Sequence, residues 1–454
     1  MPRHHRLAAA LLAFAVAASA PAAEKKPFFP YPMKVDQLPN GLTVVRVPFA
    51  SNGMIAYYSA VRTGSRNEVE AGHTGFAHFF EHMMFKGTKK YPTGEREKIL
   101  GALGFDDNAF TTDDCTIYHS FGPSSGLEKL IEVEADRFMN LEYSEPSFQT
   151  EAKAILGEYH KNAAHPELKM EEALNATAFK KHTYSHTTMG FYDDIKAMPD
   201  KYEYSKSFFQ RWYRPDNVII YIVGEFDDAK AMALVKAAYS PWQGKAAQVD
   251  IPKESPQAAP LAVGLEWETP TLPRHVQAWR TPAASLATLD GQVQNVLASY
   301  LAGPTSPVYK ELVLEKQLVE QVGAPYSEHR DPYLFTVGAM LKDEANRAAV
   351  DAAIDREVKA LASGKVDKKR VADIRSNIRY SFLMGLETAD DIAGALAYTG
   401  ALFGAPDALD RYYRRFDEVQ PQHLVDFAKK YLTEKNRTVL TLKPKAAASQ
   451  PEGK

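Results

Sequence analysis

A proline-rich stretch near the middle of the chain divides it into two blocks. Residues 241–260 contain four prolines and show little apolar periodicity, which is typical of a linker. A chain of 454 residues is long enough for two domains. We therefore expect an N-terminal domain over residues 31–240 and a C-terminal domain over residues 261–445. Strand and helix patterns alternate irregularly along the chain, so the predicted fold class is α+β.

The two blocks end alike, which indicates a duplicated domain. FFQRWYRPDNVIIYIV, with Tyr213 and Asn217, ends the first block, and FAKKYLTEKNRTVLTL, with Tyr431 and Asn436, ends the second. Each reads as a helix, a tyrosine, a short turn with an asparagine, and a strand. A single echo of this kind does not by itself establish a repeat.

Apolar patterns predict the main elements of both blocks. In the first block we expect strands at 38–47, 54–61, 115–121 and 218–226, and helices at 73–86, 127–141, 147–162 and 228–239. In the second block we expect strands near Val276 and at 438–442, and helices at 292–301 and 348–362.

Composition narrows the class of protein. Hydrophobic residues make up 45% and charged residues 24% of the chain, as in soluble globular proteins. The net charge of −3 leaves no basic excess to attract nucleic acid. The single cysteine, Cys115, excludes an intrachain disulfide and an all-cysteine metal site. A metal site in this chain therefore needs histidine, aspartate or glutamate ligands.

Residues 1–22 are predicted to be a secretory signal peptide. A basic start precedes an apolar run at residues 7–18, and Ala20-Pro21-Ala22 offers a small-residue cleavage pattern. The run is shorter than the roughly 20 residues that a membrane-spanning helix needs. We expect an exported protein, in the periplasm, without a membrane span, and a disordered tail at 446–454.

One motif in the first block carries metal chemistry. GFAHFFEHMMFKGT, residues 75–88, holds His78, Glu81 and His82 in the order HxxEH. Positions i and i+4 of a helix share a face, so both imidazoles can point at one ion with the carboxylate beside them. The alternative is a core helix whose histidines are merely hydrogen-bonded, but burying these groups without partners is costly. The motif predicts a metal site.

A zinc site that keeps one position open needs a third protein ligand. The predicted helix at 147–162 offers Glu151 and Glu158, seven residues apart on one face. Either carboxylate could turn toward the metal, and spacing alone does not choose between them.

These motifs together resemble a known peptidase family. HFFEH followed by Glu158, with Glu151 one heptad earlier, resembles the inverzincin metallopeptidases of the pitrilysin and insulinase family. NAFTTDDCTIYH, YSHTTMGF and YRPDNVIIYIVGEFD are similar to further stretches of that family. In size and layout the chain resembles the short bacterial branch related to mitochondrial processing peptidase.

The resemblance implies one Zn²⁺ per chain, held by His78, His82 and Glu158. It implies that Glu81 is the general base that activates a water at the zinc. It further implies that Glu151 hydrogen-bonds a ligand imidazole from behind and fixes its tautomer. The activity expected from the resemblance is that of a zinc-dependent endopeptidase acting on unfolded peptides.

The resemblance also implies how the substrate binds and how the chain folds. Asn108 and Ala109 begin an edge strand in the family, to which an extended peptide adds by backbone pairing; an ordinary turn before a strand is the alternative for these two residues. The expected fold is two similar domains, each a mainly antiparallel sheet packed with helices, facing each other in a clam-like arrangement.

The second block departs from the family pattern. Active members carry an arginine and a tyrosine seven residues apart, which resemble an oxyanion clamp, whereas alignment puts Val313 and Glu320 at these positions. Tyr326 is within reach of a gapped alignment, but Val319 lies seven residues before it. Losing such a donor typically costs about 10² to 10³ in rate. We expect a heterodimer whose homologous partner subunit supplies Arg and Tyr; a self-sufficient homodimer and a non-catalytic scaffold or peptide-binding subunit are the alternatives.

Overall fold

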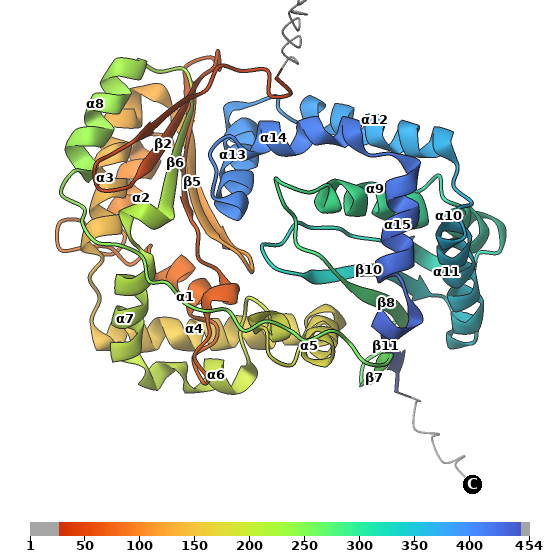
Figure 1. Cartoon of the computed structure of the whole chain (residues 1–454). Coiled ribbons are helices and arrows are strands. Elements are labelled where there is room, and N and C mark those ends of the chain that lie inside the picture. The colour runs from red at the N-terminus through yellow and green to blue at the C-terminus, as the bar shows by residue number, and fades with distance from the viewer. Residues whose placement is uncertain (1–26, 446–454) are drawn as a thin grey trace, which may run out of the picture.

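The computed structural model describes residues 27–445 and contains two β-sheets with helices packed on each (Figure 1). The predicted signal peptide at 1–22 and the predicted tail at 446–454 lie outside the described residues. The strands of the first sheet are β1 (Lys34–Gln37), β2 (Thr43–Pro48), β3 (Met54–Val61), β4 (Asp106–Thr111), β5 (Thr116–Pro123) and β6 (Val218–Gly224). Those of the second are β7 (Leu261–Trp267), β8 (Arg274–Thr281), β9 (Val319–Gly323), β10 (Tyr333–Leu341) and β11 (Arg437–Pro444).

The helices fall into the same two groups. The first half contains α1 (Phe76–Met83), α2 (Glu95–Ala102), α3 (Leu127–Asn140), α4 (Glu145–Ala163), α5 (Pro166–Ala178), α6 (Tyr192–Ala197), α7 (Tyr202–Trp212) and α8 (Asp228–Tyr239). The second half contains α9 (Asp290–Ala302), α10 (Pro307–Tyr309), α11 (Arg347–Ala362), α12 (Lys368–Met384), α13 (Ala389–Phe403), α14 (Ala408–Arg414) and α15 (Pro421–Tyr431).

The two sheets share one strand order. The first runs β1-β2-β6-β3-β5-β4 and the second β7-β11-β8-β10-β9. With β1 set aside, each sheet places its first strand beside its last, and then its second, fourth and third. In each, the first and last strands are parallel and the remaining pairs antiparallel. The predicted α+β fold of two similar, mainly antiparallel domains is confirmed.

The echo seen in the sequence is a repeated helix ending. The side-chain amide of Asn217 donates to the carbonyl of Trp212 (3.0 Å) at the end of α7, and that of Asn436 donates to the carbonyl of Tyr431 (2.8 Å) at the end of α15. A short 3₁₀ turn and the last strand of the domain follow each helix. The counterpart of Tyr431 is therefore Trp212, and the predicted match with Tyr213 was wrong by one residue.

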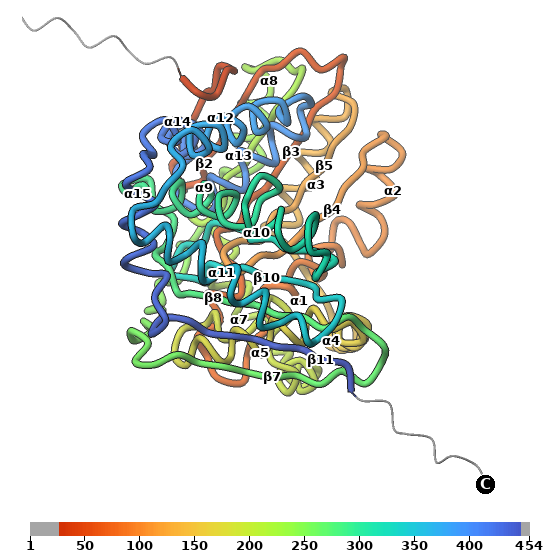
Figure 2. Tube along the Cα trace, turned by 90° about the vertical axis from the view of Figure 1, so that its right-hand side faces the viewer, coloured from red at the N-terminus to blue at the C-terminus, as the bar shows by residue number. Residues whose placement is uncertain are grey.

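The halves interlock by exchanging a helix. α13 of the second half packs on β3 and β6 of the first sheet, and α5 of the first half packs on β7 and β11 of the second. Figure 1 shows α13 lying against the first sheet, and in Figure 2 α5 lies beside β7 and β11. Burial of apolar side chains such as Ile392 and Leu396 on α13 drives this packing. Within residues 27–445, no helix is both long and apolar enough to cross a membrane.

Aromatic packing orients the helix that carries the HxxEH motif. Phe80 of α1 stacks on Phe208 of α7, with ring centroids 5.3 Å apart, and Phe79 meets Phe148 of α4 at 5.0 Å. All four rings are fully buried. Phe80 thus holds one side of α1 against α7, and Phe79 holds the helix against α4. Because of this, the side opposite Phe80, which carries the two histidines, is turned toward Glu151 and Glu158 of α4.

Candidate active site

The start of α1 is fixed by a buried carboxylate. Glu68 accepts hydrogen bonds from the backbone N–H groups of Gly75 and Ala77, each at 2.7 Å, which the first turn of a helix otherwise leaves unpaired. Gly75 has φ +88°, and a Cβ there would lie 2.6 Å from the carbonyl oxygen of Met189, so glycine is required. Burial raises the pKa of Glu68 to about 8. No spacing pattern along the chain singles out Glu68.

His78, His82 and Glu158 converge. The Nε2 atoms of His78 and His82 lie 3.7 and 3.5 Å from Oε2 of Glu158, and one ligand atom from each residue falls within 4.8 Å of the others. This is the one such group of three among the described residues. Of the two carboxylates that spacing left open, Glu158 is the one that faces both Nε2 atoms.

Glu151 lies on the other side of His82. Its Oε1 is 2.9 Å from Nδ1 of His82, and its Oε2 is 2.5 Å from Nζ of Lys86. A carboxylate at Nδ1 favours the tautomer that carries its proton there, which leaves the Nε2 lone pair free toward Glu158. The hydrogen bond with His82 has the largest effect and lowers the pKa of Glu151. Burial raises this pKa and Lys86 lowers it again, so the net shift is downward.

The donor set fits zinc. Two imidazole nitrogens and one carboxylate oxygen are ligands that catalytic zinc sites use, with a further position left open. Burial, with the charge of His82, lowers the pKa of His78 to about 4, so its imidazole is neutral, as a ligand must be. For His82, burial favours the neutral form, but the hydrogen bond and charge of Glu151 outweigh it and raise the pKa.

Glu81 faces the same space from α1. Its Oε2 accepts a hydrogen bond from Oγ1 of Thr111 at 2.6 Å, at the end of β4. Burial raises the pKa of Glu81, and the bond from Thr111 partly offsets this. A carboxylate with a raised pKa, held by one oxygen, is suited to accept a proton at the other. Sequence reasoning did not single out Thr111, although it lies two residues after Ala109 on the same strand face.

A cavity of about 490 Å³ opens beside these groups. His78, Glu81, Thr111 and Glu158 line it, and every other lining residue also comes from the first half of the chain. Acidic side chains are prominent, since Glu167 and Glu171 join Glu81 and Glu158. Phe110 and His165 add rings to the wall. Burial, reinforced by the charge of Asp113, raises the pKa of Glu171 to about 7.

The two positions that the resemblance aligns with an Arg/Tyr clamp lie outside this cavity. Val313 is in an irregular helical segment at residues 310–315, and Glu320 is an exposed residue of β9. Neither Val313 nor Glu320 is among the described residues that line the cavity.

Asn108 and Ala109 lie on β4, at the edge of the first sheet. β4 pairs with β5 on one side, and within residues 27–445 no strand pairs with its other side. Asn108 is exposed, whereas Ala109 and Thr111 alternate with it on the half-buried face, against which α1 packs. The edge of β4 therefore runs directly past the helix that carries His78, Glu81 and His82.

Comparison with family models matches both halves of the chain. Residues 57–191 match the model described as insulinase (peptidase family M16), and residues 201–378 match the one described as peptidase M16 inactive domain.

Curated relatives include named proteases and a processing peptidase. The chain is 28% identical to zinc protease PqqE of Helicobacter pylori over 417 residues, covering 90% of this chain and 92% of the relative. It is 23% identical over 420 residues to a probable mitochondrial-processing peptidase subunit beta of Arabidopsis thaliana, covering 90% and 78%.

Solved structures of similar proteins have the same fold. A crystal structure of a protease from Helicobacter pylori superposes with a TM-score of 0.84 at 27% identity, covering 91% of this chain and all of the other. The periplasmic protease PqqL from Escherichia coli has the same fold, with a TM-score of 0.72 at 18% identity; 91% of this chain is covered, but only 48% of PqqL, so the chain spans about half its length. The chain belongs to the insulinase, or peptidase M16, family.

Proposed function

We propose that this protein is a zinc-dependent endopeptidase subunit that hydrolyses unfolded peptides. The observation that carries the proposal is the convergence of His78, His82 and Glu158 beside Glu81 in one cavity. The names of several relatives as zinc proteases support it.

The residues divide the chemistry among them. His78, His82 and Glu158 would hold Zn²⁺, which when bound supplies a Lewis acid that polarises a peptide carbonyl and makes a nearby water more acidic. Glu81 accepts the proton of the attacking water at the carboxylate oxygen that Thr111 does not occupy, and then delivers it to the leaving amine. Glu151 holds His82 in the tautomer that presents Nε2 to the metal.

The free edge of β4 is the proposed substrate platform. An extended peptide can add to it as a further strand along Asn108 and Ala109, pairing with the backbone groups of this stretch that point away from β5. Such pairing requires an unfolded segment, because the backbone groups of a folded protein are already paired.

A homologous partner subunit is the proposed source of the missing clamp. No residue of the described second half lines the cavity, and Val313 and Glu320 cannot donate to an oxyanion as Arg and Tyr do. Similarity to a processing peptidase named as a beta subunit supports a second, related chain. For location we propose export to the periplasm, supported by the pattern of residues 1–22 and by the PqqL relative.

The decisive variant is Glu81→Gln. We expect the wild type to bind one Zn²⁺ per chain and to cleave unfolded peptides, and Glu81→Gln to retain zinc but lose cleavage by at least about 10²-fold. Glu145→Gln, the same change at an exposed position of α4, serves as the control and should be silent. Wild type and Glu81→Gln are assayed with and without a homologue that carries the Arg/Tyr pair, and equal activity of the two under both conditions contradicts the peptidase. Zinc content near zero in the wild type favours the scaffold instead.

The partner requirement needs a separate test. Purified alone, the chain should cleave slowly, and an added homologue that carries the Arg/Tyr pair should raise the rate by about 10² to 10³. Full activity of the lone chain, abolished by Glu81→Gln, would exclude the partner but keep the peptidase.

A further inference from the structure

The turn that follows the substrate strand is held from the second half of the chain. The site turn, residues 112–115, joins β4 to β5 and begins directly after Thr111. It carries two adjacent aspartates, Asp113 and Asp114, and Asp114 is only 3% exposed. Buried carboxylates need hydrogen-bond partners, and these two draw theirs from three separate segments.

Two of these segments belong to the first half. Ser65 donates its hydroxyl to Oδ1 of Asp113 (2.9 Å), and the Tyr184 hydroxyl donates to Oδ1 of Asp114 (2.9 Å). Gly64 allows the close approach, because a Cβ there would lie 2.3 Å from the carbonyl oxygen of Thr112.

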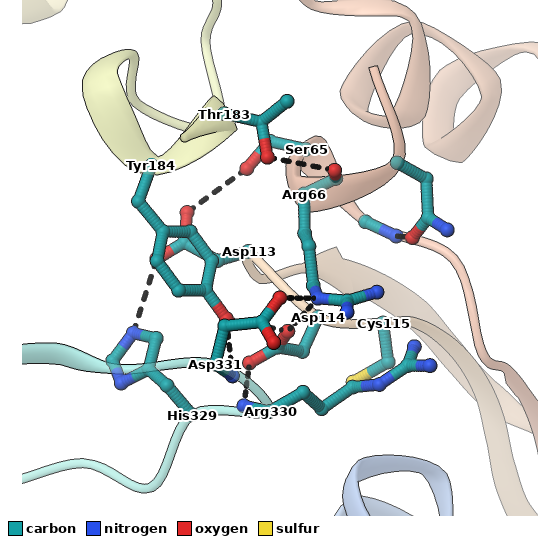
Figure 3. Close-up of polar contacts among 12 residues, drawn as sticks. Ser65, Arg66, Asp113, Asp114, Cys115, Thr183, Tyr184, His329, Arg330 and Asp331 are labelled. Atoms are coloured by element: carbon teal, nitrogen blue, oxygen red, sulfur yellow. Dashed lines mark hydrogen bonds and ion pairs between the residues drawn. The ribbon is translucent and has the colours of Figure 1, made fainter. Parts of the chain in front are cut away.

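The third segment is the buttress loop, residues 327–332, which precedes β10 in the second half. Nε2 of His329 lies 3.1 Å from Oδ2 of Asp113, and the backbone N–H of Arg330 donates to Oδ2 of Asp114 at 3.0 Å. Figure 3 shows His329 and Arg330 reaching Asp113 and Asp114 from the opposite side to Ser65.

His329 is built to hold this position. Its ring stacks on Tyr333 with centroids 3.7 Å apart, and its Nδ1 lies 3.1 Å from the carbonyl of Ser327. Since both ring nitrogens face acceptors, the charged imidazolium satisfies both. Burial opposes that charge, but the hydrogen bond and charge of Asp113 outweigh it and raise the pKa of His329. The contact is thus a partly buried ion pair between residues 216 apart in sequence.

The loop is anchored on its other side as well. Asp331 lies 2.5 Å from Nε of Arg66 and 3.0 Å from Nε2 of His182. Thr183 in turn donates to the carbonyl of Arg66 at 2.8 Å. The buttress loop is therefore fixed to the first half at two points, one of which is the site turn.

The site turn matters because it ends the strand that touches Glu81. β4 has a single strand partner among the described residues, so its position depends on β5, on α1, on α2 through the ion pair of Arg96 with Asp107, and on the turn, which holds the end next to Thr111. We infer that the second half of the chain positions this strand: the buttress loop, with His329 as a positioning residue acting through Asp113, holds the turn that sets Thr111 against Glu81. The effect on catalysis rests on the proposed function, whereas the positioning of β4 by the buttress loop does not.

The test compares two contacts that both cross between the halves. His329→Leu removes the bond to the site turn, and His329→Gln keeps a donor there. Tyr58→Phe is the matched control, because it removes the Tyr58 hydroxyl bond to Asp390 (2.9 Å), which joins β3 to α13 away from the turn. Asp113→Asn, which keeps the size of the side chain, is the second variant if His329→Leu does not fold.

Two readouts are taken on the zinc-loaded full chain. Amide hydrogen exchange over residues 106–116 should rise at least about 10-fold in His329→Leu, recover in His329→Gln and remain unchanged in Tyr58→Phe. In peptide cleavage, kcat should fall about 10-fold in His329→Leu with KM and zinc content unchanged, because only the alignment of Thr111 and Glu81 is lost.

The outcomes separate the inference from the proposed function. Wild-type exchange over residues 106–116 in both His329→Leu and Asp113→Asn overturns the inference, whether or not the protein cleaves peptides. Increased exchange there with kcat unchanged overturns the catalytic part. If Glu81→Gln shows that the protein is not a peptidase, the exchange result still decides whether the buttress loop positions β4.

Discussion

Nδ1 of His82 lies 2.9 Å from Oε1 of Glu151, on the opposite side of the ring from Glu158. The two nitrogens of one imidazole thus have different partners: Glu151 faces Nδ1, and Glu158, the third proposed ligand, faces Nε2. Lys86 holds the other oxygen of Glu151 at 2.5 Å. The arrangement fixes both the rotation and the tautomer of the His82 ring before any metal arrives.

Glu151→Ala should therefore weaken zinc binding while leaving all three proposed ligands in place. Removing a carboxylate that hydrogen-bonds a metal-binding histidine typically lowers metal affinity about 10- to 100-fold. We expect a loss of zinc affinity in that range, measured by competition with a chelator. Glu145→Ala removes an exposed carboxylate of the same helix and should leave the affinity unchanged. Unchanged affinity in Glu151→Ala would contradict the role of Glu151.

The hydrogen bond from Thr111 to Glu81 gives a second prediction. Thr111→Val keeps the shape of the side chain but removes the donor, so the Glu81 carboxylate loses the bond that holds one of its oxygens. We expect kcat to fall about 10-fold with KM and zinc content unchanged. Thr111→Ser, which retains the hydroxyl, should recover most of the rate. A Thr111→Ser variant as slow as Thr111→Val would show that the methyl group, and not the hydroxyl, matters.

Local chemistry of the site could be predicted from the sequence because it depends on spacing within one helix. His78 and His82 are four residues apart, and any helix brings such a pair to one face. The choice between Glu151 and Glu158 could not be made in this way. It depends on how α4 is rotated against α1, which is set by the packing of side chains such as Phe148.

Contacts between distant segments escaped prediction for a similar reason. The pair of His329 and Asp113 and the capping of α1 by Glu68 have no periodic or spacing signal. The repeat was visible in the sequence, but its alignment was wrong by one residue, since Trp212 and not Tyr213 takes the place of Tyr431. Counting back five residues from Asn217 and from Asn436 gives the register that the hydrogen bonds show.

The buried carboxyl of Glu68 predicts a pH-dependent stability. Its pKa in the folded protein, about 8, lies above the usual value for glutamate, so the unfolded chain releases this proton at lower pH than the folded chain. The contribution of Glu68 to stability is therefore largest below about pH 4.5 and declines as pH rises toward 8. Glu68→Gln cannot ionise, so its stability deficit relative to wild type should shrink between pH 5 and pH 8.

Urea unfolding in the presence of a chelator measures this without a contribution from metal binding. Glu70→Gln is the control variant. The hydrogen bond from Arg211 lowers the pKa of Glu70 by more than burial raises it. Glu70 stays ionised in both states from pH 5 to pH 8, so its deficit should be flat across this range. Parallel pH profiles for the two variants would contradict the raised pKa of Glu68.

The packing of α13 on the first sheet can be tested at a single glycine. A Cβ at Gly400 would lie 1.7 Å from the hydroxyl oxygen of Tyr221 and 2.9 Å from its Cζ, and Tyr221 is fully buried in β6. Overpacking of a core typically costs about 1 to 3 kcal/mol, so Gly400→Ala should lower the urea midpoint with an unchanged slope. Gly394→Ala is the matched control on the same helix, because its nearest contact would be an ordinary 3.5 Å.

The mechanism is checked by adding Tyr221→Phe. The Tyr221 hydroxyl is buried and has no hydrogen-bond partner in the described structure, so removing it should cost little by itself. In the Gly400→Ala background it removes the atom in closest conflict and should recover part of the lost stability, since the remaining approach is 2.9 Å. Equal stability of the Gly400→Ala and Gly394→Ala variants would mean that α13 does not pack on β6 as closely as the structure has it, and that the two halves are less tightly interlocked.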